Sequence, residues 1–76
     1  MPRYYFHIRD EDGVSPDSEG CDLPDLAAAR IEARASARDL MFDCLRANKP
    51  PDGRKIEIAG ENGAVIETIA LRDLLH

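Results

Sequence analysis

One segment limits the possible folds of this 76-residue chain more than any other, the stretch from Asp25 to Ala47. It contains neither Gly nor Pro and is rich in Ala, Arg and Leu, which are strong helix formers. Asp25, or Asp22 in a shifted register, can cap its first turn, and Asn48 can take the left-handed conformation after its last turn. Pro50-Pro51 then prevents continuation. The sequence therefore predicts one long helix against which everything else must pack.

Segments with the two-residue alternation of β-strands lie on both sides of this helix. They are residues 3–9, fragments at 14–15 and 20–21, and residues 55–58 and 64–69, which flank an Asn-Gly hairpin signal. Residues 71–76 fit either a terminal helical turn or a continuation of the last strand. The prediction is a single α+β domain over residues 1–76: a small antiparallel sheet of three to four strands, order β-(β)-α-β-β, with the helix packed on it.

The predicted helix carries two apolar rows, whereas one small sheet can cover only one of them. The first apolar row suits close packing on a sheet and consists of Leu26, Ala29, Ala33, Ala37, Leu40 and Cys44. The second apolar row lies roughly opposite and consists of Ala28, Ile31, Ala35, Phe42 and Leu45. We expect Leu40, and Phe6 of the first strand, to be nearly fully buried. The second apolar row needs either the loop of residues 10–23 or a second copy of the chain, and the copy is favoured because the residues of the loop are mostly acidic and small.

Charges on the helix are segregated as well. Arg30, Arg34 and Arg38 follow one another every four residues and form a basic ridge, while Glu32, Asp39 and Asp43 form an acidic flank. Like charges at this spacing repel, so an anionic group is expected beside the ridge. The candidates are the acidic loop of residues 10–22, the acidic flank of a second copy packed antiparallel, and the phosphates of a nucleic acid.

Nothing in the sequence predicts catalysis, a cofactor or a metal. The chain contains no His-x-x-x-His, Cys-x-x-Cys, phosphate-binding loop or nucleophile-elbow pattern. Cys21 precedes the helix and Cys44 lies near its end, and a rise of about 1.5 Å per residue separates the two ends by about 29 Å. A disulfide requires Cα atoms within about 7 Å, so we expect two free thiols. Because the catalytic motifs are missing, we also expect that the protein is not an enzyme.

One strand face is a weak candidate for a ligand. Tyr5, His7 and Arg9 share the more polar face of the first strand, a set that can stack on bases or bind an anion. With 10 Lys and Arg against 15 Asp and Glu, the net charge of −5 opposes nucleic acid, and favours a solvated or interface face instead. No apolar run approaches the ~18 residues of a membrane helix, and the start lacks a signal-like apolar region. We expect a cytoplasmic protein without membrane contact.

Three segments resemble a family of short bacterial proteins of unknown function that begin PRYFFHI. They are residues 2–10 (PRYYFHIRD), residues 20–30 with their LPDLAAAR run, and residues 52–54 before the closing hairpin. The resemblance spans nearly the whole chain. It implies a cytoplasmic stand-alone domain, and it assigns no activity and no catalytic residue.

The outline is also similar, more weakly, to the HicB-type antitoxins. Asp10-Glu11-Asp12-Gly13, the acidic loop, Asp22-Leu23-Pro24 and the Ala-rich helix match the small domain of that family. The chain lacks the DNA-binding region usual there and ends in a hairpin. This resemblance therefore implies binding of a toxin-like protein rather than regulation of DNA.

Together these features favour a non-enzymatic interaction module that forms a homodimer through its long helix. The expected interface comprises Ile31, Phe42 and Leu45 with the basic ridge (Arg30, Arg34, Arg38) and the acidic flank (Glu32, Asp39, Asp43). The alternative is an antitoxin-like module that binds an unidentified basic protein through the acidic loop. Binding of nucleic acid is a third hypothesis, which the net charge disfavours.

Overall fold

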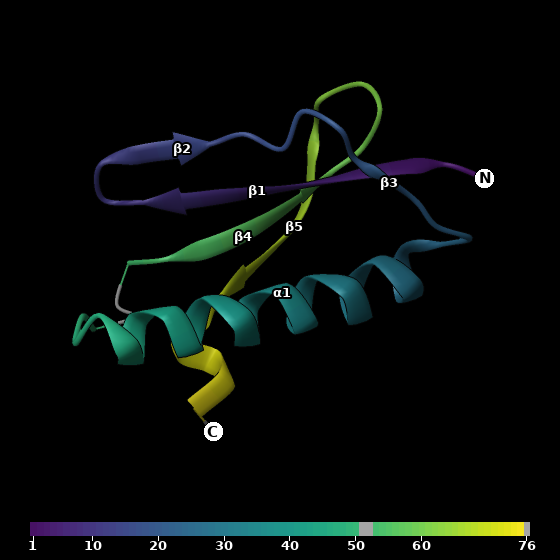
Figure 1. Ribbon diagram of the computed structural model, residues 1–76. Helices are drawn as coiled ribbons and strands as arrows, with labels where there is room; N and C mark the ends of the chain where they lie inside the picture. The colour runs from purple at the N-terminus through teal and green to yellow at the C-terminus, as the bar shows by residue number, and fades with distance from the viewer. Residues whose placement is uncertain (51–52, 76) are drawn as a thin grey trace.

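β1 (Arg3–Asp10) is the longest strand, and most of the sheet is built around it. The computed structural model, which describes residues 1–50 and 53–75, places the other elements as drawn in Figure 1. They are β2 (Gly13–Ser15), β3 (Cys21–Asp22), helix α1 (Leu26–Arg46), β4 (Lys55–Ala59), β5 (Val65–Ala70) and the 3₁₀ helix η1 (Leu71–Leu75). The predicted α+β class and element order are confirmed, with the second strand divided into two pieces.

The sheet is antiparallel throughout and follows the order β2-β1-β4-β5, while β3 also pairs with β1. β2 pairs with the end of β1 around Arg9, and β3 pairs with its start at Arg3 and Tyr4. On the other side of β1, Phe6 lies opposite Ile58 of β4. β5 then pairs with β4, which makes β5 the outer strand on that side.

Both hairpins turn at dipeptides that are typical of tight turns, Asp12-Gly13 in the first and the predicted Asn62-Gly63 in the second. In the first, the Asp10 carboxylate accepts hydrogen bonds from the backbone N–H of Asp12 at 2.8 Å and of Gly13 at 3.1 Å. In the second, Asn62 Oδ1 accepts from Ala64 N–H at 3.0 Å, and Gly63 has a φ of 84°. Short polar side chains and glycine thus fix the turn geometry locally. Asp52-Gly53 is a further dipeptide that favours a tight turn, but Asp52 lies outside the described residues.

The ends of α1 agree with the predicted caps. Asp25 is the N-cap, and its carboxylate accepts a hydrogen bond from Ala28 N–H at 2.9 Å. After the last turn, Asn48 takes a φ of 56°, and Lys49 N–H donates to the Cys44 carbonyl at 2.8 Å. The left-handed residue reverses the chain and satisfies a carbonyl that the helix itself leaves unpaired.

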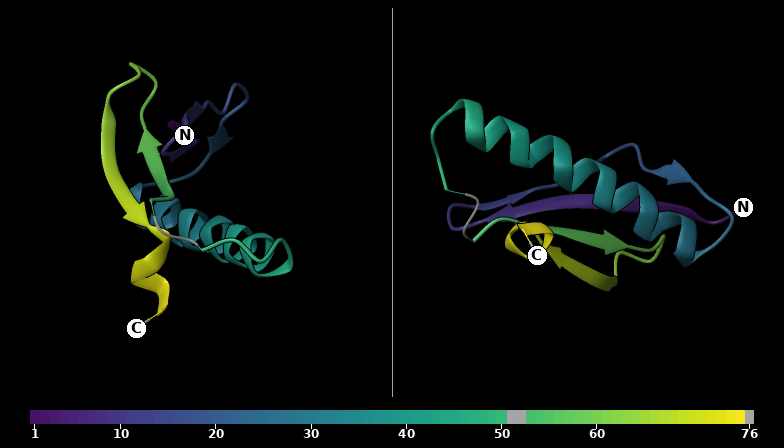
Figure 2. Two further views of the ribbon diagram at one scale, coloured as in Figure 1. Left: turned by 90° about the vertical axis from the view of Figure 1, so that its left-hand side faces the viewer. Right: turned by 90° about the horizontal axis from the view of Figure 1, so that it is seen from below.

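α1 lies along one face of the twisted sheet, and within the described part of the chain no helix lies on the other face (Figures 1 and 2). The first apolar row faces the sheet, with Ala29, Ala33 and Ala37 fully buried. Their small side chains allow the helix to approach the strands closely. The buried cluster also contains Tyr4 of β1, Ile56 and Ile58 of β4, and Leu71 of η1.

The prediction that Phe6 and Leu40 are nearly fully buried is wrong. Both are only half-buried and pack against the margin of the cluster. The physical reason is the path of α1, which packs mainly on β4 and η1 rather than on β1. Leu71, which no periodic pattern singled out, takes a central place instead and is fully buried.

The segment after β5 turns into η1, so the helical alternative for residues 71–75 is the correct one. Leu71 N–H donates to the Arg54 carbonyl at 3.0 Å and links the start of η1 to the residue before β4. No helix in the described ranges is both long and apolar enough to span a bilayer.

Candidate interaction surface

The second apolar row is exposed along the outer side of α1. The exposed fractions are 71% for Ile31, 63% for Phe42 and 68% for Leu45, and Ala35 is exposed as well. Ala28, at the start of the row, is half-buried. The alternative that the loop of residues 10–23 covers this row is therefore wrong. That loop instead runs along β1, with β2 and β3 at its two ends.

The basic ridge finds its internal partner on β5, not in the acidic loop. Arg30 Nε donates to both carboxylate oxygens of Glu67 at 2.9 Å. The hydrogen bond from Arg30 lowers the pKa of the Glu67 carboxyl, and the same bond raises the pKa of Arg30. The expectation that the acidic loop folds back on the ridge is wrong, since no loop carboxylate in the described residues forms an ion pair with it.

Arg34 and Arg38 differ from Arg30, because neither forms an ion pair with any described residue. Both line a groove of about 650 Å³ that runs between α1, β5 and η1. Its apolar lining comes from Met41, Phe42, Ile69 and Leu74, and its polar lining includes Glu67, Thr68 and Asp73. The groove thus adjoins the second apolar row at Phe42.

On the opposite flank of α1, the predicted acidic residues are exposed. Asp43 accepts a hydrogen bond from Arg46 Nη2 at 2.9 Å, one turn further along the helix. Glu32 and Asp39 have no ion pair among the residues that the structure describes. Among the described residues, the helix therefore presents the unpaired Arg34 on one side of the second apolar row and the unpaired Glu32 and Asp39 on the other, with Arg38 within the row itself.

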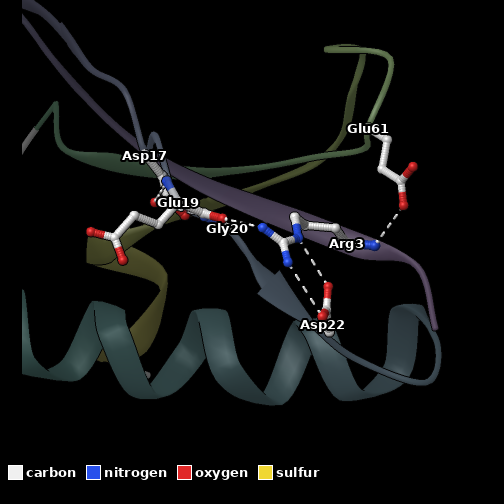
Figure 3. A network of polar contacts seen from close by, with 6 residues as sticks. All are labelled: Arg3, Asp17, Glu19, Gly20, Asp22 and Glu61. Atoms are coloured by element: carbon white, nitrogen blue, oxygen red, sulfur yellow. Dashed lines mark hydrogen bonds and ion pairs between the residues drawn. The ribbon is translucent and has the colours of Figure 1, made fainter.

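The acidic loop has a largely internal role, part of which is drawn in Figure 3. Arg3 Nε donates to Asp22 Oδ1 at 3.0 Å, and Arg3 Nη1 donates to the Glu19 carbonyl at 3.0 Å. The backbone N–H of Arg3 donates to Glu61 at 2.9 Å. The hydrogen bond from Arg3 lowers the pKa of the Asp22 carboxyl. At Gly20 a Cβ would lie 2.8 Å from Arg3 Cγ, so only glycine fits beneath this side chain.

Asp17 closes the gap between β2 and β3. Its carboxylate accepts backbone hydrogen bonds from Phe6 at 3.1 Å and from Glu19 and Gly20 at 3.2 Å. It therefore satisfies a β1 donor where no strand is present to do so. Burial acts to raise the pKa of this carboxyl, but the backbone donors and the nearby His7 outweigh burial, so the pKa lies below its ordinary value.

The residues of the weak candidate ligand face share one side of β1, but they are engaged with their neighbours. Tyr5 and His7 stack with ring centroids 6.3 Å apart. His7 Nδ1 accepts a hydrogen bond from Asp17 N–H at 2.9 Å, and Arg9 Nε donates to Glu57 at 2.8 Å. A ligand would have to compete with these contacts, so the face is better explained as part of the β-sheet structure.

Only part of the acidic loop is available to bind a basic partner protein. Asp10, Asp17 and Asp22 bind groups of the same chain, which leaves Glu11, Asp12 and Glu19 exposed. The antitoxin-like hypothesis stays a prediction, and these three residues are the acidic surface that the loop would offer to a basic protein. Cys44 is buried and Cys21 half-buried, and both are free thiols as expected. In residues 1–50 and 53–75, no group of three metal-ligating side chains gathers.

Sequence reasoning missed the structural roles of Glu67 and Asp17. Glu67 interrupts the apolar pattern of residues 64–69 on the side that faces the helix, and this irregularity is the only local signal for its pairing with Arg30. Asp17 follows Pro16, a common position for a side chain that bonds the backbone of a turn.

Neither a protein of established annotation nor a solved structure matches the chain significantly. A family described as "Domain of unknown function (DUF6894)" matches residues 3–72. This range runs from the start of β1 into η1 and contains every strand and the whole of α1. Because the match covers nearly the complete fold, the protein belongs to the DUF6894 family, which agrees with the predicted membership of a family of unknown function.

Proposed function

We propose that this protein is a non-enzymatic interaction module that self-associates through the outer side of α1. The observation that carries the proposal is the exposure of Ile31, Phe42 and Leu45 along one side of a single rigid helix. Each such side chain is stabilised by roughly 1.5–3 kcal/mol when it leaves water completely. Residues that dominate the energy of an interface cluster near its centre, where aromatic anchors are common, and Phe42 is the aromatic residue of this row.

The spacing of the second apolar row supports a parallel pair of helices. Ala28, Ile31, Ala35, Phe42 and Leu45 occupy alternating three- and four-residue steps of a heptad pattern, with Arg38 filling the one remaining seam position. In a parallel pair, opposite flanks of the two helices meet, so Arg34 of one copy lies near Asp39 of the other. The antiparallel arrangement expected from sequence would bring like-charged flanks together, which disfavours it.

The first test is the oligomeric state, measured by light scattering at high micromolar protein concentration. We expect a dimer for the wild type and monomers for Ile31→Asp and Phe42→Asp, because an unpaired carboxylate would be buried in the seam. Val14→Asp is the matched control, since it adds the same charge at an exposed apolar position on β2. A monomeric wild type, or a dimer that survives both helix substitutions, contradicts the proposal.

A charge exchange tests the orientation separately. Arg34→Glu and Asp39→Arg are each expected to weaken the dimer, and the double variant is expected to regain most of the lost affinity. Because both side chains are exposed in the single chain, folding is unaffected, which circular dichroism checks. Additive weakening in the double variant would exclude the parallel arrangement without excluding dimerisation through the helix.

A further inference from the structure

The outer edge of β5 offers backbone hydrogen-bonding groups that no described strand uses. Leu71 N–H donates to the Arg54 carbonyl across the β4–β5 pair. Bonded and non-bonded residues alternate along an antiparallel pair, so the backbone N–H and carbonyl of Thr68 are directed away from β4. The N–H of Ala70 is directed the same way, whereas its carbonyl takes the first i→i+3 hydrogen bond of η1. An edge of this kind is a template for another strand.

The opposite edge of the sheet is closed by comparison. β2 and β3 occupy the two ends of β1, and the Asp17 carboxylate already binds Phe6 N–H between them. β2 itself spans only three residues. Strand addition is therefore favoured at β5, where the pairing edge is longer and where the groove lies directly beside it.

The groove determines which side chains an added strand would need. Its wall on α1 carries Arg34 and Arg38, one turn apart and without carboxylate partners among the described residues. The acidic groups at the groove weigh less, since Glu67 is neutralised by Arg30 and Asp73 lies on η1 at one end. The apolar lining of Met41, Phe42, Ile69 and Leu74 accepts aliphatic carbon.

We propose that the β5 edge and the adjoining groove bind an extended acidic segment of a partner protein, which adds a strand beside β5. Alternate side chains of such a segment point toward α1, where carboxylates reach Arg34 and Arg38. The other side chains of the segment point to the opposite face of the sheet, which α1 does not cover. This proposal does not rest on dimerisation through α1. Because both contacts use Phe42 and the two arginines, the acidic segment binds the single chain and competes with the dimer, whereas the strand edge belongs to this proposal alone.

The test is fluorescence anisotropy with short labelled peptides added to the full chain. The probes are a peptide of alternating Val and Glu, the same peptide with Lys for Glu, and a peptide with residues 64–70 of this chain. We expect the Glu peptide to bind at least about fivefold more tightly than the Lys peptide, from two exposed arginine–carboxylate pairs. Equal affinities overturn the acidic assignment, and tighter binding of the residue 64–70 peptide assigns the edge to a second copy instead.

Strand addition is tested on the protein by Thr68→Pro, which removes an N–H directed away from β4. We expect it to abolish binding of the Glu peptide while the dimer measured by light scattering persists. Arg34→Glu with Arg38→Glu should reverse the preference to the Lys peptide. The matched control, Arg46→Glu with Lys49→Glu, changes the net charge equally at the end of α1 and should leave the preference for the Glu peptide intact.

Strand addition is also tested on the peptide, so that the result does not depend on how Thr68→Pro folds. Two Glu peptides are N-methylated at alternate backbone amides, one on each set. Only one set faces β5 in an added strand, so one peptide is expected to lose binding and the other to retain it. If both bind as the parent peptide does, strand addition is excluded.

Discussion

At the scale of single residues, Asp17 shows how one carboxylate can replace part of a strand. Its three backbone donors come from β1 and from the loop that follows it, so it joins segments that β2 and β3 leave unpaired. Its own N–H donates to His7 on the outer face of β1. Arg3 and Asp22 complete this edge of the sheet.

The lowered pKa of Asp17 predicts an acid-sensitive contribution to stability. The folded-state pKa lies below the ordinary value of 3.8, so the contribution is complete above that value and is lost as pH falls through the folded pKa. Asp17→Ala should cost about 1–3 kcal/mol of unfolding free energy at pH 7, because Phe6 N–H loses its acceptor. Urea unfolding followed by circular dichroism at pH 7 and pH 3 measures the difference, which should shrink at the lower pH. A difference independent of pH would show that the carboxylate charge has no part in it.

At the scale of elements, α1 has one side that packs and one side that does not. Three alanines bring the first apolar row against β4, while the second apolar row faces solvent with Arg38 in its middle. An arginine in a helix seam keeps its charge in water by extending past the contact, and it opposes close approach. Dimerisation through this side is therefore expected to be reversible.

Arg38→Leu should strengthen that dimer, because the substitution completes the apolar seam. We expect the dissociation constant, from analytical ultracentrifugation over a dilution series, to fall at least about tenfold. Lys49→Leu, which adds the same side chain beyond the end of α1, should leave it unchanged. A dissociation constant that Arg38→Leu does not lower would place the interface elsewhere.

At the scale of the whole molecule, stability depends on a small core. The largest fully buried side chains in the described part of the chain are those of Ile56, Ile58, Leu71 and Cys44. Domains of this size rarely have more than about 3–5 kcal/mol of stability. Each truncation in this cluster thus removes a large share of the total. Half-buried residues at the margin, such as Phe6, matter less.

Ile58→Ala is therefore expected to unfold most of the protein, at a cost of about 2–5 kcal/mol. Phe6→Ala should cost less than Ile58→Ala despite the larger side chain, because half-buried Phe6 leaves a smaller cavity. Thermal unfolding followed by circular dichroism compares the two. A lower melting temperature for Phe6→Ala than for Ile58→Ala would show that the core is centred on β1 rather than on β4.

The parts of the fold that local chemistry controls could be predicted from the sequence, and the rest could not. Asp25 caps the helix start and Asn48 follows the helix end, and both contact residues within one turn, so the sequence alone predicts where the helix begins and ends. The pairing of Glu67 with Arg30 joins residues on different elements, and depends on how α1 crosses the sheet. The same crossing decides that Leu71 rather than Phe6 is buried. The exposed second apolar row was predictable because a one-layer sheet cannot surround a helix.

The pairing of β1 with β4 has a consequence for how the chain reaches this structure. β1 leaves the ribosome before its main partner β4, which lies beyond α1 at residues 55–59, and the buried Leu71 comes later still. Until then both apolar rows of α1 lack the sheet that would cover one of them. Closure of such long loops slows folding, so the nascent chain is a natural client for a chaperone during that interval.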